Sequence, residues 1–395
     1  MDKIIFVSDF FINELLGGAE KCNDVLVSLL QKHFVVEKRK SNLLTKQSIL
    51  NNKGCFFIVG NFFNLSEECK KTIQNECRYL IYEHDHKYLS TNNPIKFKNF
   101  MAPTKYIINK EFFKNAQKVI CQSKLHSETL YKNLLIDNIV NAGGNLWSQG
   151  DIQILQNYID SEKTIEYATM KTQNKNKGML TAIKFCEKNN YNLNSLSKVK
   201  NFVFFPQWLE SYSRVAVESR ILNCKLITNK LIGATSEEYF NLSGQCLLDK
   251  VIENNDILIE KIISIVNGKR VEPNFVKKEI PKITISCSLY DANKYISHFL
   301  EDIVEQTIFD KCELIIVNAN SPGNEEEVIQ KYCKKYENIH YHRLDHRATT
   351  TEAINMVIDE LSTGEFITIG NVDDRRRSDC LEIQAKFLMY NDDID

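Results

Sequence analysis

The chain has 395 residues, of which 43% are hydrophobic and 26% are charged. This length exceeds what one ordinary hydrophobic core supports, so we expect two or three domains. The 50 basic and 51 acidic residues give a formal net charge of −1, which argues against a protein that binds nucleic acid. Two basic runs, residues 37–40 and 375–377, remain local candidates for phosphate contact, and a solvated surface explains the first run more simply.

Cysteine usage and hydropathy indicate where the protein works. The twelve cysteines include no CxxC pair and no Cys/His cluster of the kind that binds a metal, and several lie in apolar runs, where a thiol acts as a small hydrophobe. We therefore expect a reducing, cytoplasmic environment. Residues 1–30 lack the pattern of a signal peptide, and no run reaches the roughly 20 apolar residues that cross a bilayer. We expect no transmembrane segment and leave open a peripheral contact with a membrane.

Strand-like and helix-like runs alternate almost throughout, which predicts an α/β protein with parallel sheets. Hydrophobic runs predict strands at residues 3–8, 55–60, 79–83, 118–122, 164–168, 201–205 and 225–228. Helical periodicity predicts helices at residues 20–32, 124–135, 150–158, 178–188, 213–223 and 255–266.

Two breaks divide this pattern. Residues 136–150 contain Asn-Ala-Gly-Gly-Asn, and residues 267–281 are polar and bounded by prolines. After the second break the alternation restarts, with strands expected at 283–288, 313–317, 339–343 and 366–370 and helices at 293–306, 324–336 and 349–361. We predict two lobes, residues 1–140 and 141–270, then a linker at 271–281 and a separate α/β domain at 282–395.

Two glutamates, Glu210 and Glu218, follow the strand expected at 201–205 and are separated by seven residues. The turn after this strand opens a helix near Ser213, whose free N–H groups and positive dipole end can hold a diphosphate. Acidic side chains beside it can accept hydrogen bonds from sugar and ribose hydroxyls. The spacing alone is a weak signal, but its place after a buried strand favours a nucleotide-sugar site.

A glycine pair, Gly17-Gly18, precedes the first helix and allows a phosphate to approach the backbone closely. It is not GxGxxG, so a dinucleotide-binding fold is not indicated. With the glutamate pair, residues 1–266 resemble a family 4 glycosyltransferase of GT-B fold, which has two Rossmann-like lobes. The resemblance implies that Gly17 and Gly18 border the donor cleft, Glu210 contacts the transferred sugar and Glu218 holds the ribose. It also implies an acceptor side on the first lobe, a donor side on the second, retention of anomeric configuration and no required metal.

The same resemblance extends to a cationic position. Lys177-Gly178 takes the place of the family's Lys-Gly pair, which implies that Lys177 neutralises the diphosphate. The family's upstream arginine is missing, and Lys171 and Lys175 are the nearest substitutes. Arg214 could replace it, or could pair with Glu210.

The resemblance also implies a donor-facing histidine after a first-lobe strand, where this chain has both His84 and His86. The sequence does not separate the two. A metal site with Asp85 would need further ligands that we do not find, and structural hydrogen bonding at the strand end is another alternative.

Residues 282–390 resemble the front half of a family 2 glycosyltransferase of GT-A fold, through the opening strand, Tyr290-Asp291 and residues 305–317. The resemblance implies that Asp291 faces the nucleotide base. It also places Asp373 and Asp374 at the family's D-x-D motif, where they would hold Mn²⁺ or Mg²⁺. Asn371 stands where the motif has its first aspartate, and capping of the next helix is an alternative role for the acidic pair.

The family's acceptor half and catalytic base have no counterpart before residue 395, so we expect this domain to be an incomplete one in a longer parent protein. The sequence as a whole predicts a glycosyltransferase that moves a sugar from a UDP- or GDP-sugar to a hydroxyl of a glycan, lipid or protein. One alternative is a non-catalytic module that binds a nucleotide or sugar. In another, the GT-A domain is the metal-dependent enzyme, and the first part positions its acceptor.

Overall fold

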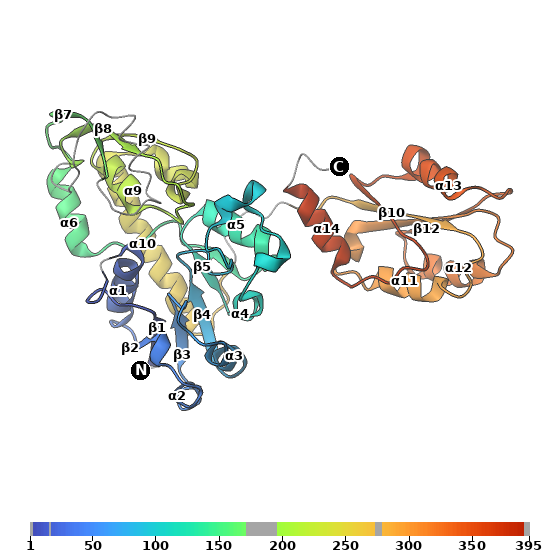
Figure 1. Cartoon of the computed structure of the whole chain (residues 1–395), viewed down its shortest axis with the longest axis horizontal. Coiled ribbons are helices and arrows are strands. Elements are labelled where there is room, and N and C mark those ends of the chain that lie inside the picture. Colours follow the sequence, from blue (N-terminus) through green and yellow to red (C-terminus); the bar gives the residue numbers. More distant parts are fainter. Residues whose placement is uncertain (1–2, 16, 171–195, 273–278, 391–395) are drawn as a thin grey trace. The chain divides into compact units, whose positions relative to one another are not determined.

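The computed structural model describes residues 3–15, 17–170, 196–272 and 279–390. It divides into two compact units, Met1–Phe275 and Val276–Asp395, whose elements are labelled in Figure 1. Lys177, Lys171, Lys175 and the helix predicted at 178–188 lie outside the described residues.

The larger sheet of the first unit has six parallel strands in the order β2-β1-β3-β4-β5-β6. Its strands are β1 Lys3–Ser8, β2 Val35–Lys40, β3 Phe56–Val59, β4 Arg78–Tyr82, β5 Val119–Cys121 and β6 Ile139–Asn141. The intervening helices are α1 Gly18–Leu30, α2 Lys46–Leu50, α3 Glu67–Glu76, α4 Lys110–Lys114 and α5 Lys124–Leu134.

The run at residues 37–40 belongs to edge strand β2, which the hydrophobic pattern did not predict. Its charges are paired on the surface of the first unit: Glu37 binds Lys3 at 2.7 Å, Lys38 binds Asp24 at 2.7 Å and Lys40 binds Glu14 at 2.6 Å. The charged run is therefore explained by ion pairs on an exposed edge strand.

A second, smaller sheet of the first unit has three parallel strands in the order β7-β8-β9. Its strands are β7 Ile165–Thr169, β8 Val199–Phe204 and β9 Lys225–Thr228, and its helices are α6 Gln149–Tyr158, α9 Arg214–Ile221 and α10 Gly244–Val266. The first unit therefore contains two parallel sheets, each with helices packed on it.

Helix α10 is longer than the prediction of residues 255–266, and it contributes to both cores of the first unit. Leu247, Leu248 and Val251 near its start pack with the β7-β8-β9 sheet. Its last turns, which include Leu258 and Ile262, pack with the six-stranded sheet. A segment that the predicted boundaries assign to the second lobe thus completes the core of the first.

The second unit is a four-stranded parallel sheet in the order β12-β11-β10-β13. Its strands are β10 Ile283–Leu289, β11 Cys312–Asn318, β12 Ile339–Arg343 and β13 Phe366–Ile369. Its helices are α11 Ile296–Val304, α12 Glu325–Lys335, α13 Thr350–Met356, continued by a π-helical turn at Val357–Leu361, and α14 Cys380–Met389.

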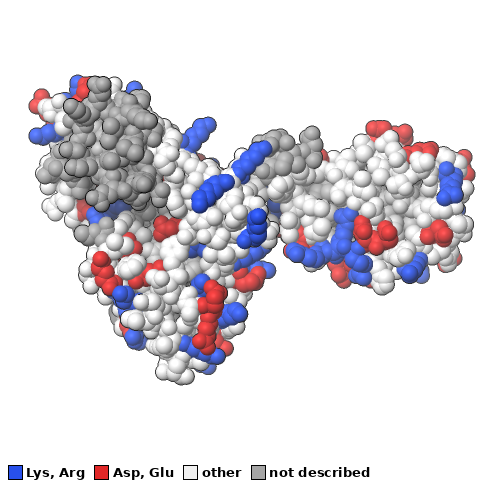
Figure 2. All heavy atoms as spheres, viewed as in Figure 1, with Lys and Arg blue, Asp and Glu red and all other residues white. Residues whose placement is uncertain are grey.

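Helix α14 begins at Cys380, after the N-cap residue Asp379. The alternative in which Asp373 and Asp374 cap this helix is therefore wrong, because several residues separate the acidic pair from its first turn. Acidic and basic side chains are interspersed on the face shown in Figure 2. Within the described ranges, no helix is long and apolar enough to cross a membrane.

Candidate functional site

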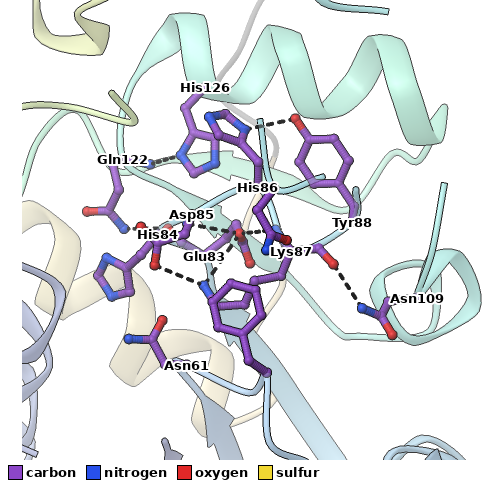
Figure 3. A network of polar contacts seen from close by, with 12 residues as sticks. Asn61, Glu83, His84, Asp85, His86, Lys87, Tyr88, Asn109, Gln122 and His126 are labelled. Carbon is purple, nitrogen blue, oxygen red and sulfur yellow. Dashed lines mark hydrogen bonds and ion pairs between the residues drawn. The ribbon is translucent and has the colours of Figure 1, made fainter. Parts of the chain in front are cut away.

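The loop after β4 carries a buried network of charged side chains, drawn in Figure 3. Glu83 is fully buried, and its Oε1 accepts hydrogen bonds from the backbone N–H groups of Asp85 at 3.1 Å and Lys87 at 2.9 Å. The Lys87 Nζ atom lies 3.6 Å from Glu83 Oε1 and 3.5 Å from Asp85 Oδ2. Burial raises the pKa of Glu83, and the Lys87 charge opposes that rise. These ion pairs lie at the strand end that carries His84 and His86, and no sequence pattern predicted them.

The two candidate histidines face different helices. The His84 Nε2 atom lies 2.9 Å from Oδ1 of Asn23 on α1. The His86 Nδ1 atom lies 2.9 Å from the Tyr88 hydroxyl, and its ring packs on that of His126 on α5, with centroids 4.8 Å apart. Burial lowers the pKa of His84 to about 3 and that of His86 to about 4, so both rings are neutral at pH 7.

The glycine pair lies at the start of α1, with Gly17 as the N-cap residue. A Cβ atom on Gly17 would lie 2.1 Å from Glu20 Oε2, whereas one on Gly18 would meet nothing within 4 Å. Glu20 is 5% exposed, and its Oε1 accepts a hydrogen bond from Asn61 Nδ2 at 3.1 Å. Burial raises the pKa of Glu20. The charge of Asp85 raises this pKa further, and the charge of Lys87 lowers it. The Glu20 carboxylate thus explains the glycine at position 17 and links this turn by a hydrogen bond to the loop after β3.

The glutamate pair flanks the start of α9. The Glu210 N–H donates to the carbonyl of Leu231, and the Glu210 carbonyl accepts from the N–H of Gly233, both at 2.9 Å. Ser213 has a left-handed backbone with φ of 82°, and its buried Oγ has no hydrogen-bond partner among the described residues. Burial raises the pKa of Glu218, and the charges of Arg214 and of Lys21 on α1 oppose it. The second glutamate therefore lies near the helix that follows the glycine pair.

Arg214 is held by protein groups. Its guanidinium donates to the Leu146 carbonyl at 2.7 Å and to Asp151 Oδ2 at 3.0 Å, and it lies 3.9 Å from the centroid of the Trp147 ring. Its Nε atom is 3.9 Å from Glu218 Oε1. These contacts anchor α9 to α6 and to the segment that precedes it.

Residues 208–211 contact the loops of the six-stranded sheet. Trp208 Nε1 donates to the Asn92 carbonyl at 3.1 Å, and Ser123 Oγ donates to the Ser211 carbonyl at 2.7 Å. The structure therefore brings the segment containing Glu210 to the loops that follow β4 and β5.

The second unit has a pocket of about 310 Å³ near the carboxyl ends of β10 and β13. Asp291, Asp373 and Asn371 line it, together with Ser288, Tyr290, Ala292, Tyr295, Thr350, Ile354, Ile369 and Val372. The carboxyl ends of parallel strands are the usual place for ligands in open α/β sheets. Two residues predicted from distant motifs, Asp291 and Asp373, thus line one pocket.

The other charged residues after β13 have partners within the protein. Asp374 Oδ2 accepts a hydrogen bond from Asn371 Nδ2 at 2.9 Å. Arg375 binds Asp302 through two hydrogen bonds, of 2.8 and 2.9 Å, and Arg377 binds Asp379. Arg375 and Arg377 are therefore engaged in ion pairs within the protein, and the Arg376 guanidinium donates to the Ile369 carbonyl.

The second unit's pocket offers oxygen atoms to a metal ion, but few of them come from acidic side chains. Among the described residues, no group of three or more His, Cys, Asp or Glu side chains is placed to hold one metal ion. Asp373, Asp291 and Asn371 do supply oxygen donors of the kind that Mg²⁺ and Mn²⁺ prefer. A metal in this pocket would therefore need further oxygen ligands from a substrate.

The sequence of the second unit matches a known protein family. Residues 285–394 match the profile of Glycosyl transferase family 2. Over 109 residues the chain is 28% identical to a Bacillus subtilis protein named "Putative teichuronic acid biosynthesis glycosyltransferase TuaG", covering 28% of this chain and 42% of that protein. Over 110 residues it is 31% identical to an uncharacterized glycosyltransferase of Mycoplasma genitalium, covering 27% of this chain and 37% of that protein. The chain thus spans about two fifths of the length of these curated relatives.

Solved structures resemble parts of the chain at low TM-scores. The mannosyltransferase PcManGT from Pyrobaculum calidifontis, in complex with GDP-Man and Mn²⁺, is 22% identical, with 28% of this chain and 33% of that chain covered and a TM-score of 0.27. A glycosyltransferase from Rickettsia africae is 12% identical, with 68% and 98% covered and a TM-score of 0.40. At these TM-scores the likeness of the first unit to family 4 and to a GT-B fold stays a prediction. The profile match and the curated relatives support a Glycosyl transferase family 2 domain at residues 285–394.

Proposed function

We propose that this protein transfers a sugar from a nucleotide diphosphate sugar to a hydroxyl acceptor. The main support is the pocket of the second unit, because it lies within the family 2 segment and is lined by Asp291 and Asp373. The curated relatives that match this segment are named as glycosyltransferases.

In this pocket Asp291 would accept hydrogen bonds from the nucleotide, and Tyr290 and Tyr295 would flank it. Tyr290 is already fixed from one side, because the Arg347 guanidinium lies 4.3 Å from its ring centroid. Asp373, with the oxygen of Asn371, would hold Mn²⁺ or Mg²⁺, which when bound neutralises charge on the leaving diphosphate.

A second donor site in the first unit is favoured by the approach of three segments: the turn at Gly17-Gly18, the loop with His84 and His86, and the segment from Glu210 to Glu218. The unpartnered Ser213 Oγ and the N-terminus of α9 would receive the diphosphate there, with Lys177 as a further cation. Glu210 would orient the sugar and Glu218 the ribose. Such a site would act without a metal and with retention of configuration.

Donor turnover by the 395-residue chain separates these sites. We expect hydrolysis or transfer from UDP- or GDP-sugars that is stimulated by Mn²⁺ and falls at least 100-fold in Asp373→Ala. The exposed control Asp310→Ala should leave it unchanged. Activity that persists in EDTA and is lost in Glu210→Ala, but not in the control Glu238→Ala, would assign turnover to the first unit.

The binding-module alternative predicts thermal stabilisation by nucleotide sugars without turnover, because a ligand that binds the folded state raises its stability. A chain that neither turns over nor is stabilised by any UDP-, GDP-, ADP- or CDP-sugar, with or without Mn²⁺, would contradict both the enzymatic proposal and this alternative.

A further inference from the structure

The loop after β4 and its neighbours form a charged group at one edge of the six-stranded sheet, here called the Lys87 cluster: Glu20, Asn61, Glu83, Asp85 and Lys87. Asn61 follows β3 and bonds Glu20 on α1, and the other three residues follow β4. Figure 3 shows the Lys87 ammonium between Glu83 and Asp85, and also draws Asn61. Phe62 and Phe63 hold this ammonium, their ring centroids 5.8 and 5.2 Å from Nζ.

Polar atoms of the cluster are not fully paired. The Lys87 side chain is 1% exposed, yet its two carboxylate partners lie at 3.5 and 3.6 Å, beyond the 2.7–2.9 Å usual for such pairs. Asn61 is 6% exposed, and within the described part of the chain its Oδ1 has no hydrogen-bond partner, nor has Glu83 Oε2. Since unpaired buried polar groups destabilise a fold, these atoms point to a polar group that the cluster receives.

The chemistry of these atoms selects the kind of group. The ammonium of Lys87 only donates hydrogen bonds, whereas Asn61 Oδ1 and the carboxylates only accept them. A hydroxyl group does both, so it can bridge Lys87 to its acidic neighbours. An anion would satisfy Lys87 and be repelled by the carboxylates, and within the described residues no three side chains are placed to share a metal ion.

Charge also argues against an anion. Three carboxyl groups of the cluster face one ammonium, and the adjacent His84 and His86 rings are neutral at pH 7. Asp85 provides the entrance, because its side chain is 51% exposed while Glu83 and Lys87 are buried. We propose that the Lys87 cluster binds the hydroxyl groups of a neutral sugar through Asp85 and discriminates against sugars that carry a carboxylate.

As the subsite of a sugar acceptor, this inference rests on the proposed function, but binding can be measured without turnover. The probes are pairs of methyl glycosides of gluco, galacto and manno configuration. One member of each pair is the neutral hexoside, and the other is the uronide, which carries a carboxylate at C6 in place of the hydroxymethyl group. They are titrated against the 395-residue protein by ligand-observed NMR, with no nucleotide present. At least one neutral glycoside should bind about 10-fold or more tightly than its uronide.

The test variant is Asp85→Asn, which keeps the side-chain shape and removes the charge. We expect it to weaken binding of the neutral glycoside about 10-fold and to narrow its preference over the uronide. The control Asp160→Asn, at an exposed position, should change neither, and equal melting temperatures would establish that both variants are folded.

Three outcomes would overturn the inference: no glycoside binds, the uronide binds as tightly as the neutral sugar, or Asp85→Asn binds like the wild type. Glycoside binding that depends on Asp85 in a chain without transferase activity would support this inference and count against the proposed function. Sugar transfer at the wild-type rate in Asp85→Asn would support the proposed function and count against this inference.

Discussion

Three buried histidines, His84, His86 and His126, share one region of the first unit. His126 Nδ1 accepts a hydrogen bond from the Gln122 N–H at 3.2 Å. Burial lowers the pKa of all three, to about 3 for His84, to about 4 for His86 and well below its usual value for His126. Because an unfolded chain binds these protons near pH 6.5, stability is present above that pH and is lost as the pH falls toward 4.

His126→Asn tests this linkage, because the Asn oxygen can accept the Gln122 hydrogen bond without titrating. We expect the free energy of unfolding of the first unit to depend less steeply on pH between 4.5 and 6. The slope should decrease by up to about 1.4 kcal/mol per pH unit, the value for one proton. Urea unfolding at several pH values measures it, and equal slopes in wild type and variant would contradict the assignment.

Residue by residue, the sequence indicated polar chemistry at the strand end with His84 and His86, because these side chains follow an apolar run directly. It did not indicate Lys87 or Glu20. Their burial depends on Phe62, Phe63 and Asn61, which come from the loop after β3. Such contacts between distant segments leave no periodic signal in the sequence.

At the level of elements, the predicted strands of the second unit match the structure to within about two residues. Strands β10 and β11 are short apolar runs between polar turns, the pattern expected of a buried parallel strand. Strands β2 and β6 were missed for different reasons: β2 is an edge strand with charged side chains, and β6 lies within residues 136–150, which the sequence analysis interpreted as a break. The order of strands could not be read from the sequence, since it depends on which helices cover which face.

Helix α9 offers a prediction about the first unit. Arg214 joins the Leu146 carbonyl, Asp151 and the Trp147 ring at once, which a lysine cannot do because it lacks a planar, forked group of donors. We expect Arg214→Lys to lower the stability of the first unit by about 1–3 kcal/mol. The control Arg220→Lys alters only surface contacts to the carbonyls of Asn241 and Leu242. Equal denaturation midpoints for the two variants would show that the Arg214 contacts do not contribute to the stability of the first unit.

For the whole molecule, each compact unit has its own hydrophobic core. We therefore expect two unfolding transitions, and Glu313 provides a probe of the second unit. Its side chain is 4% exposed; burial alone would raise its pKa, but hydrogen bonds from Lys282, Thr284 and Thr363 lower that pKa to about 2. Because the folded-state pKa is depressed, the stabilisation is present above about pH 4.5 and is lost as the pH falls toward 2.

Glu313→Gln should lower the stability of the second unit by about 2 kcal/mol at pH 7, since hydrogen bonds to a charged group are lost. The difference from the wild type should shrink on acidification. Differential scanning calorimetry measures the unfolding temperature of each unit. Arg214→Lys serves as the comparison variant, because it should shift only the transition of the first unit. A shift of both transitions by either substitution would contradict two separately folding units.

Helix α10 runs without interruption through 23 residues, with Val251 in one core and Leu258 in the other. At 1.5 Å per residue this helix is about 35 Å long. It connects the two sheets of the first unit as one rigid element. A substrate that draws the sheets together must bend this helix or slide side chains along it. Protease cleavage in the middle of α10 would therefore uncouple the sheets and also uncover apolar surface on both.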